Sequence, residues 1–248
     1  MNKILEIKNL RKIYHTKKDE ILAVDDFSFD LYEGEFVSIV GPSGCGKSTI
    51  LSILCDLIDY SDGEIKFNND SKIGYMLQED SLFDFRNILN NCLIGLEINK
   101  NLNDETKNYV EKLLKDYGLY EFKDKYPDNL SGGMRQRVAL IRTLATNPDI
   151  LLLDEPFSAL DYQTRLAVSD DVYKTIKNEK KSAIMVTHDI AEAVSMSDRI
   201  IVLTGRPSKI KSIYEIELEN KSTPINNRKD SKFSYYYDTI WKDIDFHV

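Results

Sequence analysis

Apolar residues follow two patterns along the chain that predict β-strands. Residues 5–10 and 21–31 largely alternate apolar and polar side chains, as half-buried strands do. Other apolar runs are shorter and have no such alternation, which is typical of strands inside a parallel sheet. These runs cover residues 35–40, 150–153, 183–186 and 199–203.

Between these runs, apolar residues recur at helical spacing. Three such sets predict helices from Ile50 to Ile58, from Val110 to Tyr117 and from Val168 to Ile176. Residues 82–148 have helical character as a whole, and a short helix is expected after Asp189. Strands that alternate with helices indicate an α/β fold with a largely parallel sheet, and the helical block is inserted between its two halves.

The end of the chain has a different character. Residues 220–232 are polar, contain Pro224 and are predicted to be a linker. Residues 233–248 are predicted to form a C-terminal amphipathic helix, because its apolar and aromatic residues keep helical spacing. Those residues are Phe233, Tyr236, Tyr237, Ile240, Trp241 and Ile244. We expect this stripe to dock on the protein's own surface; the alternative is a surface for a partner.

Composition narrows the class of protein. With 42% apolar residues in 248, the chain can bury a substantial core, but no window approaches the roughly 18 apolar residues of a membrane span. A net charge of −8 argues against a nucleic-acid-binding surface. The three cysteines are odd in number and lack metal-ligand spacing, so reduced thiols in a soluble, cytoplasmic protein are expected.

A glycine-rich loop follows the strand predicted over residues 35–40. It fits the P-loop pattern and consists of Gly41, Pro42, Ser43, Gly44, Cys45, Gly46, Lys47, Ser48 and Thr49. Glycines allow successive backbone N–H groups to face phosphate oxygens, and the following helix presents its positive end to the same anion. Lys47 is expected to neutralise phosphate charge and Ser48 to ligate magnesium. The loop therefore predicts binding of a nucleoside triphosphate with Mg²⁺.

A second part of the predicted site lies at the end of the apolar run 150–153. There Asp154 follows a buried strand, where it can hold the magnesium ion that Ser48 also contacts. The next residue, Glu155, is placed to act as the base that polarises the attacking water.

The segment Leu130-Ser-Gly-Gly-Met-Arg-Gln136 resembles the signature sequence of the ABC ATPase family. Ser131, Gly132 and Gly133 precede an apolar helix and form another helix N-terminus suited to an anion. The resemblance implies that these residues bind the γ-phosphate of ATP held by the other subunit of a dimer, so that neither subunit has a complete site alone.

Four further residues match family landmarks in chain order. By this resemblance, Gln78 is the Q-loop glutamine that senses magnesium and water, and Asp161 ends the D-loop at the dimer interface. His188 is similar to the switch histidine that contacts the γ-phosphate and the attacking water. Tyr14 is similar to the aromatic residue that stacks on adenine, although a core aromatic is the alternative there.

The resemblance also implies the architecture and the activity. Residues 1–219 would form the ABC ATPase domain, with a catalytic core at 1–81 and 149–219 and a helical subdomain at 82–148. The implied fold is a P-loop NTPase core with a mostly parallel sheet, an N-terminal antiparallel β region and the inserted helical subdomain. The implied activity is hydrolysis of ATP with Mg²⁺, coupled to transmembrane solute transport.

Several details are similar to the importers of the nitrate, sulfonate and taurine type. The matching segments are residues 82–97, 160–165 and 203–207, whereas Asp84-Phe85 stands where that branch usually carries Pro-Trp before the arginine. This departure lies where a membrane subunit is expected to dock, so the sequence does not identify the membrane partner or the transported solute.

The implied partners are a second copy of the chain, transmembrane permease subunits and, indirectly, an extracytoplasmic solute-binding protein, with no nucleic acid. The implied location is peripheral, at the cytoplasmic face of the membrane. The alternatives are an ABC ATPase of another transporter class, such as an exporter, and a non-transport ABC ATPase of translation or DNA repair.

Overall fold

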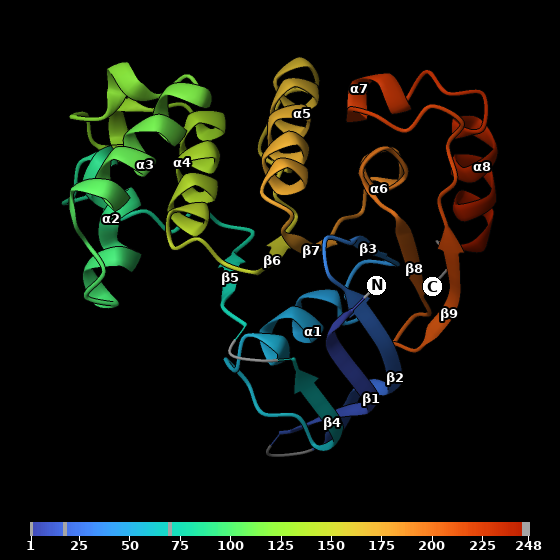
Figure 1. The fold of residues 1–248 in the computed structure, drawn as a ribbon. Helices are drawn as coiled ribbons and strands as arrows, with labels where there is room; N and C mark the ends of the chain where they lie inside the picture. Colours follow the sequence, from blue (N-terminus) through green and yellow to red (C-terminus); the bar gives the residue numbers. More distant parts are fainter. Residues whose placement is uncertain (1, 17–18, 69–70, 245–248) are drawn as a thin grey trace.

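The computed structural model describes residues 2–16, 19–68 and 71–244, in which strands and helices alternate along most of the chain (Figure 1). The strands are β1 (Lys3–His15), β2 (Glu20–Tyr32), β3 (Phe36–Val40), β4 (Asp62–Phe67), β5 (Ile73–Met76), β6 (Ile150–Asp154), β7 (Ser182–Val186), β8 (Arg199–Leu203) and β9 (Ile210–Glu215). The α-helices are α1 (Lys47–Leu54), α2 (Ile88–Ile98), α3 (Asp104–Asp116), α4 (Gly132–Ala145), α5 (Tyr162–Asn178), α6 (Ile190–Met196), α7 (Pro224–Asn227) and α8 (Phe233–Asp243). Two 3-10 turns, Tyr120–Phe122 and Pro127–Asn129, lie between α3 and α4.

A six-stranded sheet in the order β5-β6-β7-β3-β8-β9 forms the centre of the fold. Its strands run parallel except β9, which pairs antiparallel with β8. Every residue of β3, β6 and β7 is buried, because the sheet is covered on both faces. This confirms the largely parallel sheet predicted from the unalternated apolar runs.

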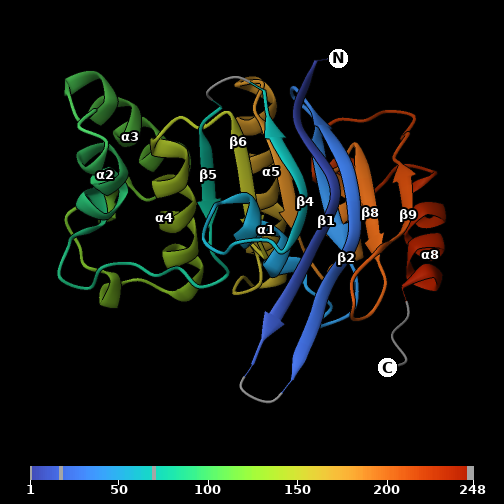
Figure 2. The ribbon, with the colours of Figure 1, turned by 90° about the horizontal axis from the view of Figure 1, so that it is seen from below.

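The first part of the chain forms a separate antiparallel sheet in the order β2-β1-β4. Helix α1 lies between this sheet and the parallel one (Figure 2). Side chains of all three meet in one buried cluster, which includes Phe27 of β2, Leu51 of α1 and Leu152 of β6. The loop that precedes α1 is thus held against both sheets.

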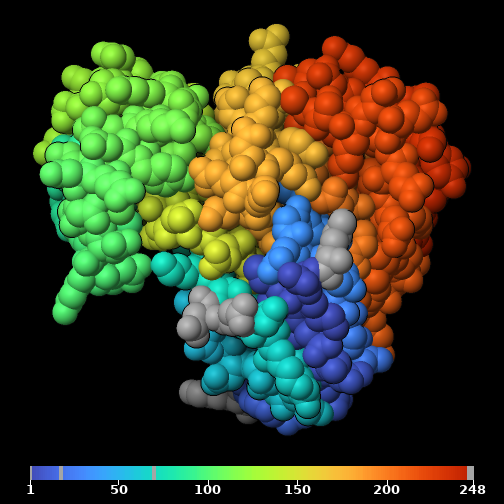
Figure 3. All heavy atoms as spheres, viewed as in Figure 1, coloured from blue at the N-terminus to red at the C-terminus, as the bar shows by residue number. Residues whose placement is uncertain are grey.

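The helical subdomain enters the chain between β5 and β6, which are neighbours in the sheet. Helices α2, α3 and α4 pack on one another through a second buried cluster that continues to α5 and the other face of the sheet. In the space-filling view this subdomain projects as a lobe beyond the rest of the molecule (Figure 3). The predicted α/β fold with an antiparallel β region and an inserted helical subdomain is confirmed.

Helix α1 ends earlier than its apolar spacing predicts. The apolar face was expected to continue to Leu57 and Ile58, but the helix ends at Leu54 and Leu57 is 61% exposed. Asp56 adopts a positive φ of 59°, and the N–H groups of Asp56 and Leu57 donate to the carbonyls of Ile53 and Ser52. This is the hydrogen-bond pattern of a Schellman cap, which ends the helix regardless of the apolar residues beyond it.

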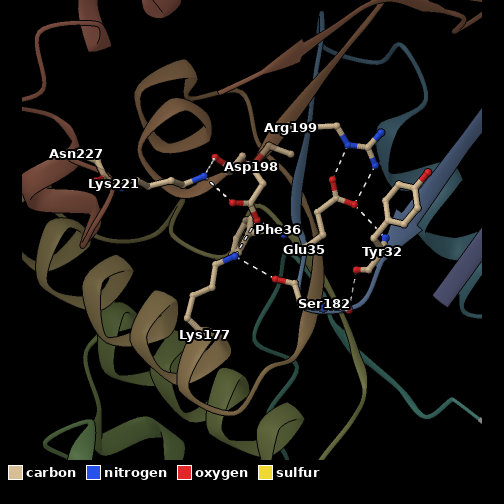
Figure 4. A network of polar contacts seen from close by, with 12 residues as sticks. Tyr32, Glu35, Phe36, Lys177, Ser182, Asp198, Arg199, Lys221 and Asn227 are labelled. Carbon is tan, nitrogen blue, oxygen red and sulfur yellow. Dashed lines mark hydrogen bonds and ion pairs between the residues drawn. The ribbon is translucent and has the colours of Figure 1, made fainter. Parts of the chain in front are cut away.

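The polar segment 220–232 is not an open linker, because it contains α7 and packs against the core. Asn227 is fully buried and donates from Nδ2 to the carbonyl of Ser195 at 2.7 Å. Lys221 lies 2.6 Å from the carboxylate of Asp198, which Lys177 also contacts at 2.8 Å (Figure 4). Burial would raise the pKa of Asp198, but the two lysines together hold it below its usual value.

The aromatic stripe of α8 docks mainly on the protein's own surface, as expected. Ile240 and Ile244 are buried in a third cluster with residues of α6 and β8, and Tyr237 packs against that cluster. The outer edge of the helix stays accessible, with Trp241 52% exposed. The predicted continuation of this helix over residues 245–248 lies outside the described residues.

Candidate active site

The P-loop connects β3 to α1, as the sequence predicts. Lys47 is the first residue of α1, and its Nζ donates to the carbonyl oxygens of Gly41 and Pro42, both at 2.9 Å. Gly46 has a φ of 121°, and a Cβ there would lie 3.0 Å from Ser208 Oγ, so a side chain would be strained and crowded. The loop therefore holds a buried ammonium group at a helix N-terminus, which suits a phosphate.

Asp154 reaches the P-loop from the end of β6. Its Oδ1 accepts a hydrogen bond from Ser48 Oγ at 3.2 Å, and its Oδ2 lies 3.4 Å from the hydroxyl of Tyr75. Burial raises the pKa of Asp154 and the charge of Glu155 adds to this, while the bond from Ser48 opposes it. A carboxylate that is costly to ionise gains most from a nearby cation.

The Ser48 hydroxyl and the Asp154 carboxylate fit a magnesium ion that is held largely by its nucleotide. The described residues contain no cluster of three or more His, Cys, Asp or Glu side chains arranged for a metal. Mg²⁺ bound to nucleotide phosphates usually takes only one or two protein ligands and keeps several waters. Ser48 and Asp154 can supply that number, and the ion would neutralise phosphate charge.

Three predicted catalytic residues converge next to this pair. The Glu155 carboxylate accepts a hydrogen bond from Gln78 Nε2 at 3.3 Å and lies 3.2 Å from His188 Nδ1. Glu155 has a φ of 47°, and its N–H donates to the carbonyl of Val186 at 2.9 Å. A positive φ is costly for glutamate, and such strain occurs often at functional sites. Gln78, Glu155 and His188 are separated in sequence but form one polar group.

Tyr14 lies beside the P-loop, on a strand that continues to His15 rather than ending near Leu10. Its hydroxyl is 3.3 Å from Thr49 Oγ1, and the residue is 37% exposed. Lys12 Nζ lies 4.9 Å from the ring centroid. An exposed aromatic ring at this position can stack on a flat ligand next to the loop.

The signature residues lie elsewhere on the surface, at the N-terminus of α4. Ser131 is exposed and caps this helix by accepting from the N–H of Met134 at 3.4 Å. A Cβ on Gly132 would meet nothing within 4 Å, whereas one on Gly133 would lie 2.8 Å from Leu160 Cδ2.

Asp161 caps α5 by accepting from the N–H groups of Gln163 and Thr164. No hydrogen bond or ion pair recorded in the described parts of the chain joins Ser131, Gly132, Gly133 or Asp161 to the P-loop.

Several residues at the site were not predicted. Tyr75 contacts Asp154, and Arg206 donates to the P-loop carbonyl of Gly44 at 2.9 Å. Gln136, the last residue of the signature segment, bridges the carbonyl of Glu155 and the N–H of Ala159, both at 3.3 Å. Gln136 and Arg206 lie in segments that the sequence already singled out, but their partners depend on tertiary contacts.

The chain is similar to known proteins over most of its length. The family model described as ABC transporter matches residues 24–158. An uncharacterised ABC transporter ATP-binding protein of Bacillus subtilis, YtlC, is 44% identical over 97% of this chain and 95% of its own length. The taurine import ATP-binding protein TauB of Roseobacter denitrificans is 37% identical over 92% of this chain and 88% of its own length.

A solved structure supports the same relationship. The ATP-binding cassette MJ0796, solved as a dimer in a post-hydrolysis state bound to ADP and Pi, superposes with a TM-score of 0.77. It is 31% identical, and the match covers 86% of this chain and 99% of that one. The chain therefore belongs to the ABC transporter family, as an ATP-binding subunit that hydrolyses ATP with Mg²⁺.

Proposed function

We propose that this subunit powers a membrane importer for small solutes of the nitrate, sulfonate or taurine type. The contact of Gln78 and His188 with Glu155, directly beside Ser48 and Asp154, carries the catalytic half of this proposal. The importer half is supported by the likeness to the taurine import protein and by the matching segments around residues 160–165 and 203–207.

The proposed roles follow from position. The P-loop, from Gly41 to Thr49, holds the phosphates, and Tyr14 stacks on the base. Asp154, Ser48 and Gln78 hold the magnesium ion and its water. The Glu155 carboxylate would accept the proton of the attacking water, and His188 would contact the γ-phosphate. These roles apply to a catalytic core of residues 1–81 and 149–219 that carries the helical subdomain 82–148.

Hydrolysis in this proposal requires two copies of the chain. Within residues 2–16, 19–68 and 71–244, no hydrogen bond or ion pair joins Ser131, Gly132, Gly133 or Asp161 to the P-loop of the same chain. A helix N-terminus with an exposed serine and an open glycine is suited to bind an anion supplied by a second subunit. The dimeric state of the MJ0796 structure supports this assembly.

The membrane partner is proposed to dock on the helical subdomain. Phe83 and Phe85 form an edge-to-face pair with ring centroids 5.5 Å apart, and they are 39% and 77% exposed. No helix within residues 2–16, 19–68 or 71–244 combines the length and apolarity of a membrane span. Permease subunits on other chains, and a solute-binding protein outside the cell, would complete the importer, with this subunit on its cytoplasmic side.

The catalytic assignment is tested with Glu155→Gln. This variant keeps the shape of the side chain but cannot accept a proton, so phosphate release should fall by about 100-fold or more. ATP binding, measured by fluorescent-nucleotide titration, should stay within about twofold of wild type. Turnover at the wild-type rate would remove Glu155 from the role of base.

The importer assignment is tested in cells that lack the gene. Uptake of labelled taurine, an alkanesulfonate and nitrate is measured before and after complementation with wild type or with Glu155→Gln. Loss of uptake of one solute, restored by the wild type alone, is expected. Unchanged uptake of all three would favour another transporter class.

A further inference from the structure

One guanidinium group contacts both loops that border the catalytic carboxylate. Arg165 of α5 donates from Nη2 to the carbonyl of Leu160, in the D-loop, at 3.1 Å. Its Nη1 donates to Asp189 Oδ2, just after the switch histidine, at 3.2 Å. Because the same guanidinium group donates to both loops, a shift of either loop moves the group and alters its hydrogen bond to the other loop.

A buried glutamate completes this connection. Glu192 of α6 is 4% exposed, and its Oε1 lies 3.6 Å from Arg165 Nε. Its Oε2 accepts a hydrogen bond from Thr187 Oγ1 at 2.8 Å, and that hydroxyl also accepts from the N–H of Asp189 at 3.0 Å. The Glu192 carboxylate thus holds Thr187 directly and Asp189 through the Thr187 hydroxyl, so it acts on both sides of His188.

The histidine itself has little other support. Its side chain is 62% exposed, and the ion-pair contact recorded for it within the described chain is the one with Glu155. Because the ring is not packed, its position depends on the backbone of residues 187–189. We propose that Glu192 and Arg165 are positioning residues for ATP hydrolysis, which fix the switch histidine relative to the D-loop. This inference rests on the roles proposed above for His188 and Glu155.

The charges around Glu192 make its contact with Arg165 sensitive to pH. Burial raises its pKa to about 7, and the neighbouring charge of Asp189 adds to the shift. The bond from Thr187 and the positive charges of Arg165 and Arg228 oppose it. The ionised form attracts Arg165, so the contact between Glu192 and Arg165 strengthens as the pH rises through about 7 and weakens as the pH falls below it.

Arg228 brings the C-terminal segment into the same group. It caps α7, and its Nε and that of Arg165 are the buried side-chain nitrogens without a hydrogen-bond partner in the described residues. The guanidinium groups of Arg165 and Arg228 are both incompletely paired, and the negative charge of Glu192 compensates them. Loss of that charge would leave two buried positive charges without it.

The first experiment measures steady-state phosphate release by the full chain with Glu192→Gln. The amide can still accept from Thr187 but cannot pair with Arg165, so kcat should fall about tenfold because the switch histidine loses its fixed position. KM for ATP should stay within about twofold, since the P-loop is untouched. Glu215→Gln, on an exposed residue of β9, is the matched control and should leave both constants unchanged.

The second experiment tests whether Thr187 and Glu192 act as one unit. Thr187→Val removes the hydroxyl and keeps the side-chain shape, and it should also lower kcat. The double variant should be no slower than the slower single variant, because both changes break the same link. Fully multiplied effects of the two changes would show that the residues act separately and would overturn the proposal.

The pH profile supplies the readout that loss of stability alone would not change. We expect the wild type to show a step in kcat near pH 7 from Glu192. This step should disappear in Glu192→Gln and move to higher pH in Arg228→Gln. The direction follows because removal of the Arg228 charge makes the carboxylate easier to protonate.

A Glu192→Gln enzyme with wild-type kcat and pH profile would refute the inference. The Glu155→Gln variant serves as the reference. If it is inactive while Glu192→Gln is normal, the inference alone fails; if it is active, the proposed catalytic roles fail.

Discussion

The two glycine-containing helix N-termini of this protein differ in how completely they are built. The P-loop before α1 is enclosed, with Lys47 bonded to the loop's own carbonyls and Ser48 bonded to Asp154. The signature segment before α4 is open, since Ser131 is exposed and a Cβ on Gly132 would touch nothing within 4 Å. The first is a formed cradle for an anion, whereas the second resembles one wall of a site that another molecule must complete.

The largest effect is expected from Lys47→Ala, which breaks the enclosed cradle. Removing a buried charged partner of a phosphate costs about 2–5 kcal/mol, equivalent to roughly 30-fold to several thousand-fold weaker ATP binding. Fluorescent-nucleotide titration of the isolated subunit measures this loss, with the melting temperature as a check on folding. ATP affinity within about threefold of wild type would contradict the role of the cradle.

Ser131→Arg should have the opposite profile, because it alters the open N-terminus only. ATP binding by the isolated subunit should be unchanged. Phosphate release should fall by about 100-fold, because the bulky arginine side chain keeps the N-terminus of α4 from the ATP of the other subunit. Loss of ATP binding instead would show that the signature segment belongs to the same site as its own P-loop.

Mixing these two variants sharpens the comparison further. A dimer of Lys47→Ala with Ser131→Arg contains one site with an intact P-loop and an intact signature, contributed by different chains. Equal mixtures should therefore recover measurable phosphate release from two inactive proteins. Mixtures that stay at the level of the separate variants, despite dimer formation in size-exclusion chromatography, would exclude a shared site.

A smaller effect, on stability, should distinguish alanine variants at the two glycines of the signature segment. Alanine at Gly133 brings Cβ to 2.8 Å from Leu160 Cδ2. The free energy of unfolding should therefore fall by about 1 kcal/mol, which lowers the melting temperature by about 2–4 °C. Alanine at Gly132 meets open space and favours a helix, so its melting temperature should be equal or higher. Equal melting temperatures for the two variants would mean that Leu160 moves aside at little cost.

The smallest effect is expected at Cys45, inside the enclosed loop. The thiol is 1% exposed, and burial raises its pKa although Lys47 opposes the shift. Alkylation by iodoacetamide at pH 7.5 should be at least about tenfold slower than for free cysteine, as measured by mass spectrometry. Rapid labelling that ATP prevents would show that the loop opens when no nucleotide is bound.

The sequence predicted the P-loop well because all its parts are consecutive. Strand β3, the glycines and α1 follow one another within residues 36–54, so local patterns were sufficient. The convergence of Gln78 and His188 on Glu155 depended on the family resemblance, because contacts across the sheet leave no local signal. Strand β9 was missed because the residues Ile210–Glu215 do not alternate apolar and polar side chains, although their burial alternates in the structure.

Two polar residues show where composition alone misleads. Asn227 lies in a segment with the composition of a linker, yet it is buried because its amide finds partners at Ser195 and Ser222. Glu192 resembles an ordinary helix-surface glutamate in sequence, and its burial becomes evident only once the helices around it are packed. Composition predicts exposure on average, but satisfied hydrogen bonds can override it at single positions.

The insertion of the helical lobe between two paired strands has a consequence for the order of folding. Strands β5 and β6 pair directly, although residues 77–149 separate them. Closing a loop of that length costs roughly 4 kcal/mol in chain entropy, whereas the helices inside it form through local contacts in microseconds. We expect the lobe to mature first and the strands to pair later. Until β6 and α5 are in place, the β5 edge would therefore stay unpaired, and the side of the lobe that packs on them would stay uncovered.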